Sequence, residues 1–395
     1  MPTAIRRSLL MGCWLVCLTS VVWGEERPQG PYPKRTSGAA SLRYEQGYPV
    51  MFLSGTPEEM GRQQGELVGD VINPMLGIPR RVAAEHGYHQ LWPVVAAMSR
   101  VLVHNAPEQY QRELEAFITA GKLDRDGIFV GNSLVELRRM GGCSAFLVQP
   151  HRSATGGLLF GRNFDFPAFG VLDRYHCIFV VKPEGKHAFV SIGYPGMIGV
   201  ISGMNDAGLA IATLDVYQSA DGSPLFDSTG VPLALTYRRI LEECTTTAEA
   251  EQLLKSVPRT TYMNLAAADR ERAVVFEITP QTVGVREADH DLVGCTNHFQ
   301  LPGLSEQRDC PRIVKLDRLS RRADPFGLKD VQQALNSVNQ GSMTIQTMIF
   351  EPDRLGLHLV MGPGPVSGQH LKVMPSAKWL NHAQPPVAAE KAPLQ

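Results

Sequence analysis

The sequence predicts an α+β fold in which antiparallel sheets are covered by helices, and three observations support this class. Residues 57–139 carry apolar side chains mostly at helical spacing. Residues 143–362 contain short runs rich in Val, Ile and Phe, joined by hairpin-sized turns such as PEGK and ADRER. Two helical stretches, 232–256 and 310–322, interrupt these strands. Strand runs interrupted in this way favour sheets with helices packed outside them.

Composition and charge limit the classes of function. The chain has 395 residues, 44% hydrophobic and 19% charged, so it can bury a large core as one big domain or two intimate layers. Its 38 basic residues balance 39 acidic ones, and no long Lys/Arg block occurs. Nothing therefore favours nucleic acid or an anionic membrane as a partner. We expect a small neutral or amphipathic substrate, and the oligomeric state stays open.

The first 24 residues have the layout of a secretory signal. Arg6 and Arg7 precede a long uncharged stretch that ends in small residues suited to a cleavage site. Too little apolar chain precedes Cys13 for a lipid-attachment site. We therefore expect an exported protein, periplasmic or extracellular, without stable membrane insertion, and leave open whether the signal is removed or retained as an anchor.

The rest of the chain divides into four segments. Residues 25–43 are rich in Pro, Gly and charge, which predicts a flexible tether. Residues 44–142 are predicted to be helical, and residues 143–374 to form the strand-rich catalytic part. The Pro/Ala-rich residues 375–395 predict a disordered tail.

The first helix has a clear start signal. Thr56 can cap it, Pro57 suits its first turn, and Glu59 stands three residues after the cap, as a capping box requires.

Five cysteines remain beyond the signal, namely Cys143, Cys177, Cys244, Cys295 and Cys310. In an oxidising compartment an odd number predicts one free thiol and up to two disulfides. We expect Cys143 to be free, and Cys295 with Cys310 is a plausible pair. The spacings contain no Cys-x-x-Cys and no His-Glu-x-x-His, so we expect no metal and no cofactor.

The stretch RRMGGCSAFLVQP places a thiol between two glycines and a strand. Cys143 could simply be a small core side chain. However, Gly141 and Gly142 permit backbone conformations that other residues resist, so the Gly142 carbonyl could come within reach of the Cys143 sulfur. Attack there would exchange the amide for a thioester, and water would then cut the chain between Gly142 and Cys143.

Such a cut would create a catalyst in one residue. A free α-amino group has a pKa of roughly 7.7 to 8, so it can accept the thiol proton near neutral pH. The thiolate would attack a carbonyl to form an acyl-enzyme, which water or another acceptor would resolve.

Six motifs in order, GTPEEMGRQQGELV, GGCSAF, GRNFDF, MNDAGLAIA, CTNHF and CPRIVKLDRL, resemble those of the autoproteolytic cysteine Ntn hydrolases. The chain looks most like the isopenicillin N acyltransferase family, with choloylglycine hydrolases and acid ceramidase-like amidases as relatives. The resemblance runs from Tyr44 to Gly362. It implies a four-layer αββα sandwich of two antiparallel sheets between helices, and an enzyme that acts on linear amides.

The resemblance assigns roles to residues around the thiol. Cys143 matches the nucleophile, and Asp165 matches the carboxylate that holds its α-amino group. Arg162 matches the guanidinium that polarises the thiol and orders the carboxylate; a nearby cation lowers a thiol pKa. Without Cys143, Arg162 and Asp165 would indicate only an ordinary surface pair.

Three further residues match the family's site. Asn297 matches the amide donor of the oxyanion hole, and Arg312 matches a second Arg near the nucleophile. Asp215 aligns where bile-salt enzymes carry an Asn, so only its backbone N–H could replace that function directly. We expect Asn264 to approach the substrate or cap a strand, and leave it outside the catalytic set.

These observations favour a self-processing amidohydrolase or acyltransferase that binds a small N-acyl amide and keeps its two chains associated after the cut. One alternative is a papain-like hydrolase that uses Cys143 and His298 without a cut, and the other is a non-catalytic exported binding protein. Loops after Phe166, around 193–199 and after Tyr217 are expected to shape the pocket. The acyl group, the leaving amine and the choice between hydrolysis and transfer stay open.

Overall fold

The computed structural model describes residues 29–137, 141–306 and 310–381. Within them the strands form one ten-stranded and one six-stranded sheet. In spatial order the larger sheet contains β1 (Arg35–Ser37), β2 (Ala40–Glu45), β3 (Tyr48–Gly55), β6 (Cys177–Pro183), β7 (Phe189–Gly193), β8 (Ser202–Asn205), β9 (Ala210–Asp215), β10 (Met263–Ala268), β11 (Ala273–Ile278) and β12 (Val283–Glu287).

The smaller sheet carries the strand that follows Cys143. Its order is β13 (Leu292–Cys295), β4 (Ser144–Val148), β5 (Leu159–Asp165), β14 (Thr344–Glu351), β15 (Gly356–Met361) and β16 (Lys372–Met374). All its neighbouring strands are antiparallel. The ladder between β5 and β14 shifts register between Thr344 and Gln346, beside the end of β5. A register shift of this kind changes the direction in which nearby side chains point, here next to Asp165.

The helices fall into an early and a late set. The early set is α1 (Pro57–Val68), α2 (Asn73–Leu76), α3 (Ile78–Glu85), α4 (Trp92–His104), α5 (Glu108–Gly121), α6 (Arg125–Asn132) and α7 (Leu134–Leu137). The late set is α8 (Leu233–Glu243), α9 (Thr247–Ser256), α10 (Pro311–Asp317), α11 (Leu328–Ser337) and α12 (Ser376–Leu380). Short 3-10 turns η1 (His89–Leu91), η2 (Pro150–Arg152), η3 (Leu172–Arg174), η4 (Arg318–Arg321), η5 (Gly341–Met343) and η6 (Pro352–Arg354) complete them.

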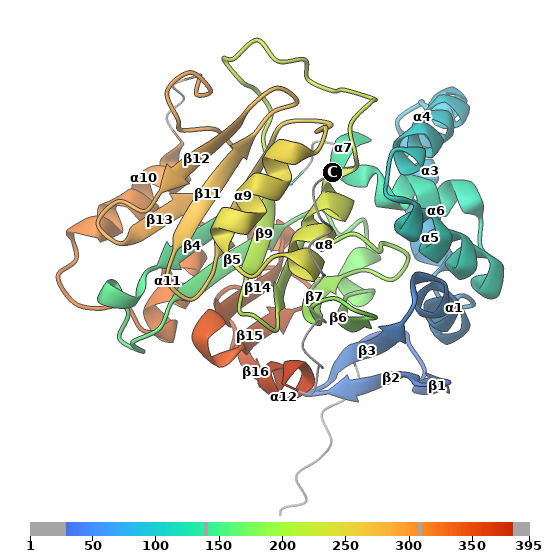
Figure 1. Cartoon of the computed structure of the whole chain (residues 1–395), viewed down its shortest axis with the longest axis horizontal. Coiled ribbons are helices and arrows are strands. Elements are labelled where there is room, and N and C mark those ends of the chain that lie inside the picture. Colours follow the sequence, from blue (N-terminus) through green and yellow to red (C-terminus); the bar gives the residue numbers. More distant parts are fainter. Residues whose placement is uncertain (1–28, 138–140, 307–309, 382–395) are drawn as a thin grey trace, which may run out of the picture.

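The two sheets face each other between outer helices, which confirms the predicted αββα layering (Figure 1). Helices α8 and α9 cover the larger sheet, and α10 and α11 cover the smaller one. The principal core is formed by residues of both sheets together with α1, α5, α8 and α9, and a second core lies between the smaller sheet and its helices. Helices α3 to α6 stand together at one side of the sandwich (Figure 1).

The expected flexible tether at residues 25–43 is wrong where the structure describes it. Residues 35–37 and 40–45 form a β-hairpin that extends the larger sheet, and Tyr32 is buried with its hydroxyl donating to the Tyr175 carbonyl. The strands alternate buried and exposed residues, as an edge hairpin does. The Pro- and Gly-rich composition marks turns here, including Gly38 at a φ of 57°, and not a lack of structure.

Two other boundaries also need correction. Residues 44–142 are not helical throughout, because β3 and most of the β2–β3 hairpin lie in this segment, and β3 pairs in parallel with β6. The larger sheet is therefore mixed and not purely antiparallel. The expected disordered tail begins too early, since α12 is ordered and buries Trp379 against Phe52 at a ring distance of 5.8 Å.

The capping box at the start of α1 is confirmed. Thr56 Oγ1 accepts from the Glu59 N–H, and the Glu59 carboxylate accepts from the Thr56 N–H at 2.8 Å. The predicted signal and Cys13 lie outside the described residues, as do residues 138–140 and 382–395.

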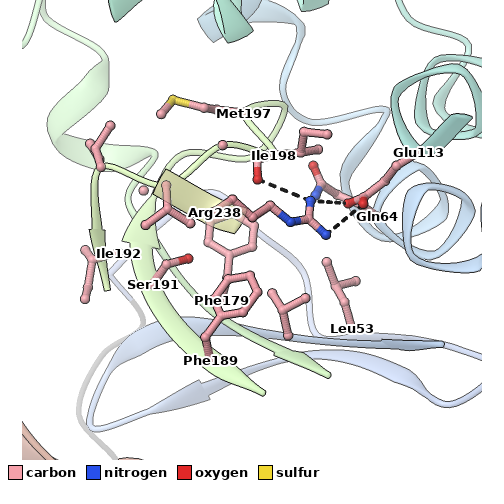
Figure 2. A pocket seen from close by; sticks show the side chains of 15 residues that line it. Leu53, Gln64, Glu113, Phe179, Phe189, Ser191, Ile192, Met197, Ile198 and Arg238 are labelled. Carbon is pink, nitrogen blue, oxygen red and sulfur yellow. Dashed lines mark hydrogen bonds and ion pairs between the residues drawn. The ribbon is translucent and has the colours of Figure 1, made fainter. Parts of the chain in front are cut away.

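A buried ion pair joins the segment before Cys143 to the segment after it. Arg238 of α8 reaches Glu113 of α5 through two contacts of 2.8 Å (Figure 2). Its Nε also donates to Glu242 at 2.7 Å. The Arg238 and Glu113 side chains are 2% and 3% exposed. Beside them a cavity of about 20 Å³ offers room for about one water molecule. Glycine is required nearby, because a Cβ on Gly61 of α1 would lie 2.1 Å from the Glu113 carbonyl oxygen.

Candidate active site

Cys143 lies directly before β4 of the smaller sheet. Its side chain is 4% exposed, and its sulfur accepts from Arg162 Nη2 at 3.5 Å. The antiparallel register of β4 and β5, which pairs Ala145 with Arg162, brings the thiol and the guanidinium together. This confirms the predicted proximity of these two residues.

The uncut chain keeps the thiol protonated. Burial raises the pKa of Cys143 to about 11, and the favourable charge of Arg162 offsets only part of that effect. Arg162 is itself fully buried and donates through Nη1 to the Thr213 carbonyl at 2.5 Å. The thiol therefore needs a local base before it becomes a nucleophile at neutral pH.

Asp165 stands at the end of β5, next to the proposed cut. Its backbone carbonyl accepts from the Gly142 N–H at 2.9 Å, and its Oδ1 accepts from Thr344 Oγ1 at 2.5 Å. Oδ2 is buried and has no hydrogen-bond partner among the described residues. Burial raises the pKa of the carboxyl to about 7, although Thr344 and the two arginines pull it down. The site thus holds an unsatisfied acceptor beside Cys143.

Arg312 connects the nucleophile to Asn297. From the start of α10 its Nη1 donates to the Cys143 carbonyl at 2.7 Å and its Nη2 to Asn297 Oδ1 at 3.0 Å. Because its oxygen accepts from Arg312, the Asn297 amide directs its N–H groups away from Arg312, and Nδ2 donates to the Asp215 carbonyl at 2.8 Å. The structure brings these residues together as predicted, whereas the oxyanion-hole role of Asn297 stays a prediction.

The Asp215 side chain contacts the residues that directly precede Cys143. Its Oδ2 accepts from the Gly141 N–H at 3.1 Å, and Tyr217 Oη donates to the Gly141 carbonyl at 2.7 Å. A Cβ on Gly141 would lie 2.8 Å from the same carboxylate oxygen, so this close approach requires glycine. The predicted role of the Asp215 backbone N–H stays a prediction.

His298 lies beside a different cysteine. Its Nδ1 is 3.0 Å from Thr296 Oγ1, which is 3.6 Å from the Cys310 sulfur, and no hydrogen bond within the described residues joins His298 to Cys143. Burial raises the pKa of Cys310, but hydrogen bonds led by that from His298 outweigh burial and lower it to about 6. The geometry gives no support to a papain-like pair of Cys143 and His298.

The expectation of disulfides is wrong for the described chain. All five cysteines from Cys143 to Cys310 are free thiols, including the suggested Cys295–Cys310 pair. Cys295 is fully buried at the end of β13, where its sulfur donates to the carbonyl of the next residue, Thr296, at 3.6 Å. A short sequence separation was too weak a signal for a bond that requires a specific side-chain geometry.

Three residues of the site were missed by the sequence reasoning. Thr344 holds Asp165, and Tyr217 holds Gly141. Gln340 packs its side chain against Gly142 and places its amide 2.9 Å from Arg312 Nε. None of them belongs to a motif. Asn264, left outside the catalytic set, donates to the carbonyls of residues 296 and 298 and so supports the loop that carries Asn297.

A cavity of about 610 Å³ opens beside the thiol, within the range of roughly 300–1,000 Å³ that is usual for small-molecule sites. Cys143 and Arg162 line one part of it, and side chains of α3, α4 and α6 line another. The predicted loops after Phe166 and at 193–199 contribute to the lining, whereas the loop after Tyr217 does not appear in it.

The described residues hold neither a metal cluster nor a membrane-spanning helix. They contain no group of three or more His, Cys, Asp or Glu side chains placed to hold a metal ion. None of the helices in that part of the chain combines the length and hydrophobicity that crossing a bilayer demands.

Comparisons with known proteins agree with the predicted family. The sequence is 22% identical over 295 residues to an uncharacterised protein of Archaeoglobus fulgidus, an alignment that covers 67% of this chain and 49% of the relative. This chain therefore spans about half the length of that curated relative.

Solved structures show a weaker likeness. An N-acylethanolamine-hydrolysing acid amidase orthologue of Caenorhabditis elegans has a TM-score of 0.44 at 18% identity, covering 59% of this chain and all of that one. A bile acid hydrolase mutant of Clostridium perfringens has 0.40 at 16%, covering 59% and 96%. Penicillin V acylase of Agrobacterium tumefaciens has 0.41 at 14%, covering 56% and 84%.

Because these TM-scores lie below 0.5, the family assignment rests on sequence. Residues 152–362, more than half of the chain, match the family described as acyl-coenzyme A:6-aminopenicillanic acid acyl-transferase. The match begins just after β4 and includes Arg162, Asp165, Asn297 and Arg312. The chain belongs to this family.

Proposed function

We propose that the protein is a self-processing amidohydrolase whose nucleophile is the N-terminal Cys143 of its second chain, with acyl transfer as a further capacity. It would hydrolyse linear amides through an S-acyl intermediate. The observation that carries this proposal is the unsatisfied Oδ2 of Asp165 beside the buried thiol. Leaving a buried acceptor unpaired is costly, and a new α-amino group at Cys143 would supply the missing donor.

The cut begins at the Gly142 carbonyl. The Cys143 sulfur attacks its carbon, the peptide C–N bond breaks, and the nitrogen takes up a proton to become the α-amino group. Water then hydrolyses the thioester, which leaves a carboxylate on Gly142 and restores the thiol. Hydrogen bonds to Asp165, Asp215 and Tyr217 hold the two glycines that precede the sulfur.

Turnover then repeats the chemistry on an external amide. The α-amino group takes the thiol proton, and the thiolate attacks the substrate carbonyl. The amine leaves with a proton, and water cleaves the acyl–sulfur bond. Arg162, whose Nη2 lies 3.5 Å from the sulfur, would stabilise the thiolate, and Asp165 would orient the α-ammonium group. Hydrolysis is favoured over transfer because water is the abundant acceptor outside the cell, where we propose that the protein acts.

The two chains would remain together after the cut. Strand β3 of the first chain pairs with β6 of the second, and the Arg238–Glu113 ion pair is buried between them. Asn132 adds two hydrogen bonds to the loop at Gly196 and Ile198. These contacts support a heterodimer formed from one precursor.

The test is an intact mass under denaturing conditions with N-terminal sequencing, on wild type and on Cys143→Ala. Two fragments in wild type, the larger beginning at Cys143, and one chain in the variant are the expected result. A wild-type chain that stays whole and still hydrolyses amides would refute the N-terminal nucleophile. A whole chain without amide hydrolysis would favour a binding protein.

A further inference from the structure

We propose that the acyl group of the substrate is a long unbranched hydrocarbon chain, received by the cavity between the early helices and the catalytic strands. This inference rests on the proposed function and names the acyl part of its substrate. The cavity holds about 610 Å³ and begins at Cys143, where an acyl group would be attached. Its chemistry then decides which acyl groups can fill it.

The part of the cavity away from the thiol is apolar. Its lining there comes from α3, α4 and α6 and includes Val82, Val95, Met98 and Val130. These side chains offer no strong hydrogen-bond donor or acceptor, so a polar atom buried against them would lose its hydrogen bonds to water and gain none in return. Methionine in such a lining also adapts its shape to a flexible chain.

Polar groups gather at the reactive end. Arg162, Thr213 and Asp215 line the cavity together with the thiol, and all of them lie on or beside the site described above. Phe164 and Phe166 line the cavity as well, with their rings stacked at 5.4 Å, and Phe164 is one residue before Asp165. The cavity thus has one polar end for the amide and a long apolar remainder.

This distribution distinguishes between three acyl groups. A bile acid would bury several ring hydroxyls, and a peptide-like acyl group would bury its amides, in a lining where Tyr88, Trp92 and Tyr194 offer few polar groups to pair with them. A hydrocarbon chain leaves nothing unpaired. The cavity also reaches Tyr88 and Leu91, which are 59% and 51% exposed, so its far end lies close to the surface and admits a long chain.

A series of N-acyl amides with one common amine, from butanoyl to dodecanoyl, tests the inference on the processed enzyme. Each buried methylene should raise kcat/KM about fourfold, so the eight methylenes added between the ends of the series give up to about 60,000-fold, and burial of only four of them gives about 250-fold. A cholyl amide and an N-acetyl-dipeptide amide of the same amine should be poorer than the dodecanoyl amide by at least tenfold.

A glycine in the lining provides a way to obstruct the cavity. Gly131 of α6 is a lining residue, and a Cβ added there meets no heavy atom within 4 Å. Gly131→Phe should lower kcat/KM for the dodecanoyl amide at least tenfold and leave the butanoyl amide within about twofold. Gly77→Phe is the matched control, because Gly77 lies outside the lining, has an ordinary helical φ of −74°, and admits a Cβ with ordinary contacts.

The outcomes separate the two proposals. Hydrolysis with a flat chain-length profile, or equal loss of both substrates in Gly131→Phe, would overturn the acyl assignment and leave the proposed function standing. Failure to hydrolyse any amide, together with no acylation of Cys143 by p-nitrophenyl butanoate, would overturn the proposed function and this inference with it. Calorimetric binding of the dodecanoyl amide, but not the butanoyl amide, to uncut Cys143→Ala would support the cavity assignment independently of turnover.

Discussion

Replacing Glu113 with Gln should weaken the whole fold, because it removes one charge from a buried ion pair. Arg238 makes two 2.8 Å contacts with Glu113 and one of 2.7 Å with Glu242, and all three side chains are at most 3% exposed. Glu242 also accepts from Lys186 Nζ at 2.7 Å and from Tyr110 Oη at 2.8 Å. After the substitution, Glu242 would be the one carboxylate left on Arg238, whereas Lys186 would also keep its contact of 3.0 Å with Glu243.

The expected loss follows from the state of the remaining arginine. Removal of one partner from a buried pair costs about 3–5 kcal/mol, since the other charge stays buried and uncompensated. Glu242 still holds the Arg238 Nε, and the Gln amide oxygen can accept one hydrogen bond. We therefore expect the lower end of the range, about 3 kcal/mol in the free energy of unfolding.

Urea unfolding followed by circular dichroism would measure this loss in the uncut Cys143→Ala background, where a single chain unfolds. The matched control is Glu115→Gln, two residues further along α5, whose ion pair with Arg125 is about half exposed on both sides. A pair of this kind contributes at most about 1 kcal/mol. Equal losses for the two variants, or a gain in stability for Glu113→Gln, would refute the reasoning from burial.

Three other predictions concern the site. Asp165 has a folded pKa of about 7 against an ordinary value of 3.8, so uncut protein loses stability as pH rises from about 4 to 7. In the Cys143→Ala background, Asp165→Asn should therefore raise the free energy of unfolding by up to about 4 kcal/mol more at pH 8 than at pH 4, as measured by urea unfolding. A difference in unfolding free energy that does not change with pH would contradict this. Cys310, with a pKa of about 6, should show a rate of alkylation by iodoacetamide that is half-maximal near pH 6, measured by peptide mapping. His298→Ala should raise the pH of that midpoint. A wild-type midpoint above pH 8 would show that no thiolate is stabilised. Asn297→Ala should lower kcat about 100-fold in steady-state assays if it donates to the oxyanion, and an unchanged kcat would remove that role.

Local signals predicted much of the fold and the centre of the site. Thr56 and Glu59 form the capping box that their spacing indicates, because a cap depends only on neighbouring residues. Strands β4 and β5 follow one another in the sequence and pair antiparallel, which places Arg162 beside Cys143. Their proximity therefore also follows from nearby sequence.

Long-range packing explains what the sequence did not reveal. Thr344 reaches Asp165 from 179 residues away, through a strand pairing whose register shift has no sequence signature. Gln340 precedes the same strand. Composition predicts flexible ends at residues 25–43 and 375–395, because it hides the partners that order strands β1 and β2 and helix α12, such as Phe52 for Trp379. Composition describes a segment alone, whereas order at a chain end depends on what the segment contacts.

The parallel pairing of β3 with β6 carries a consequence for the lifetime of the protein under the cleavage that we propose. In the uncut chain, the two strands return to each other by closing a loop within one molecule. After the proposed cut, an opened sheet could be rebuilt only if two separate polypeptides met, and dilution would make that encounter rare. Persistence of activity would then be set by how fast the folded heterodimer first opens, and no longer by the balance between folded and unfolded forms. The strand pairing and the ion pair that join the two chains would therefore determine how long each processed molecule stays active.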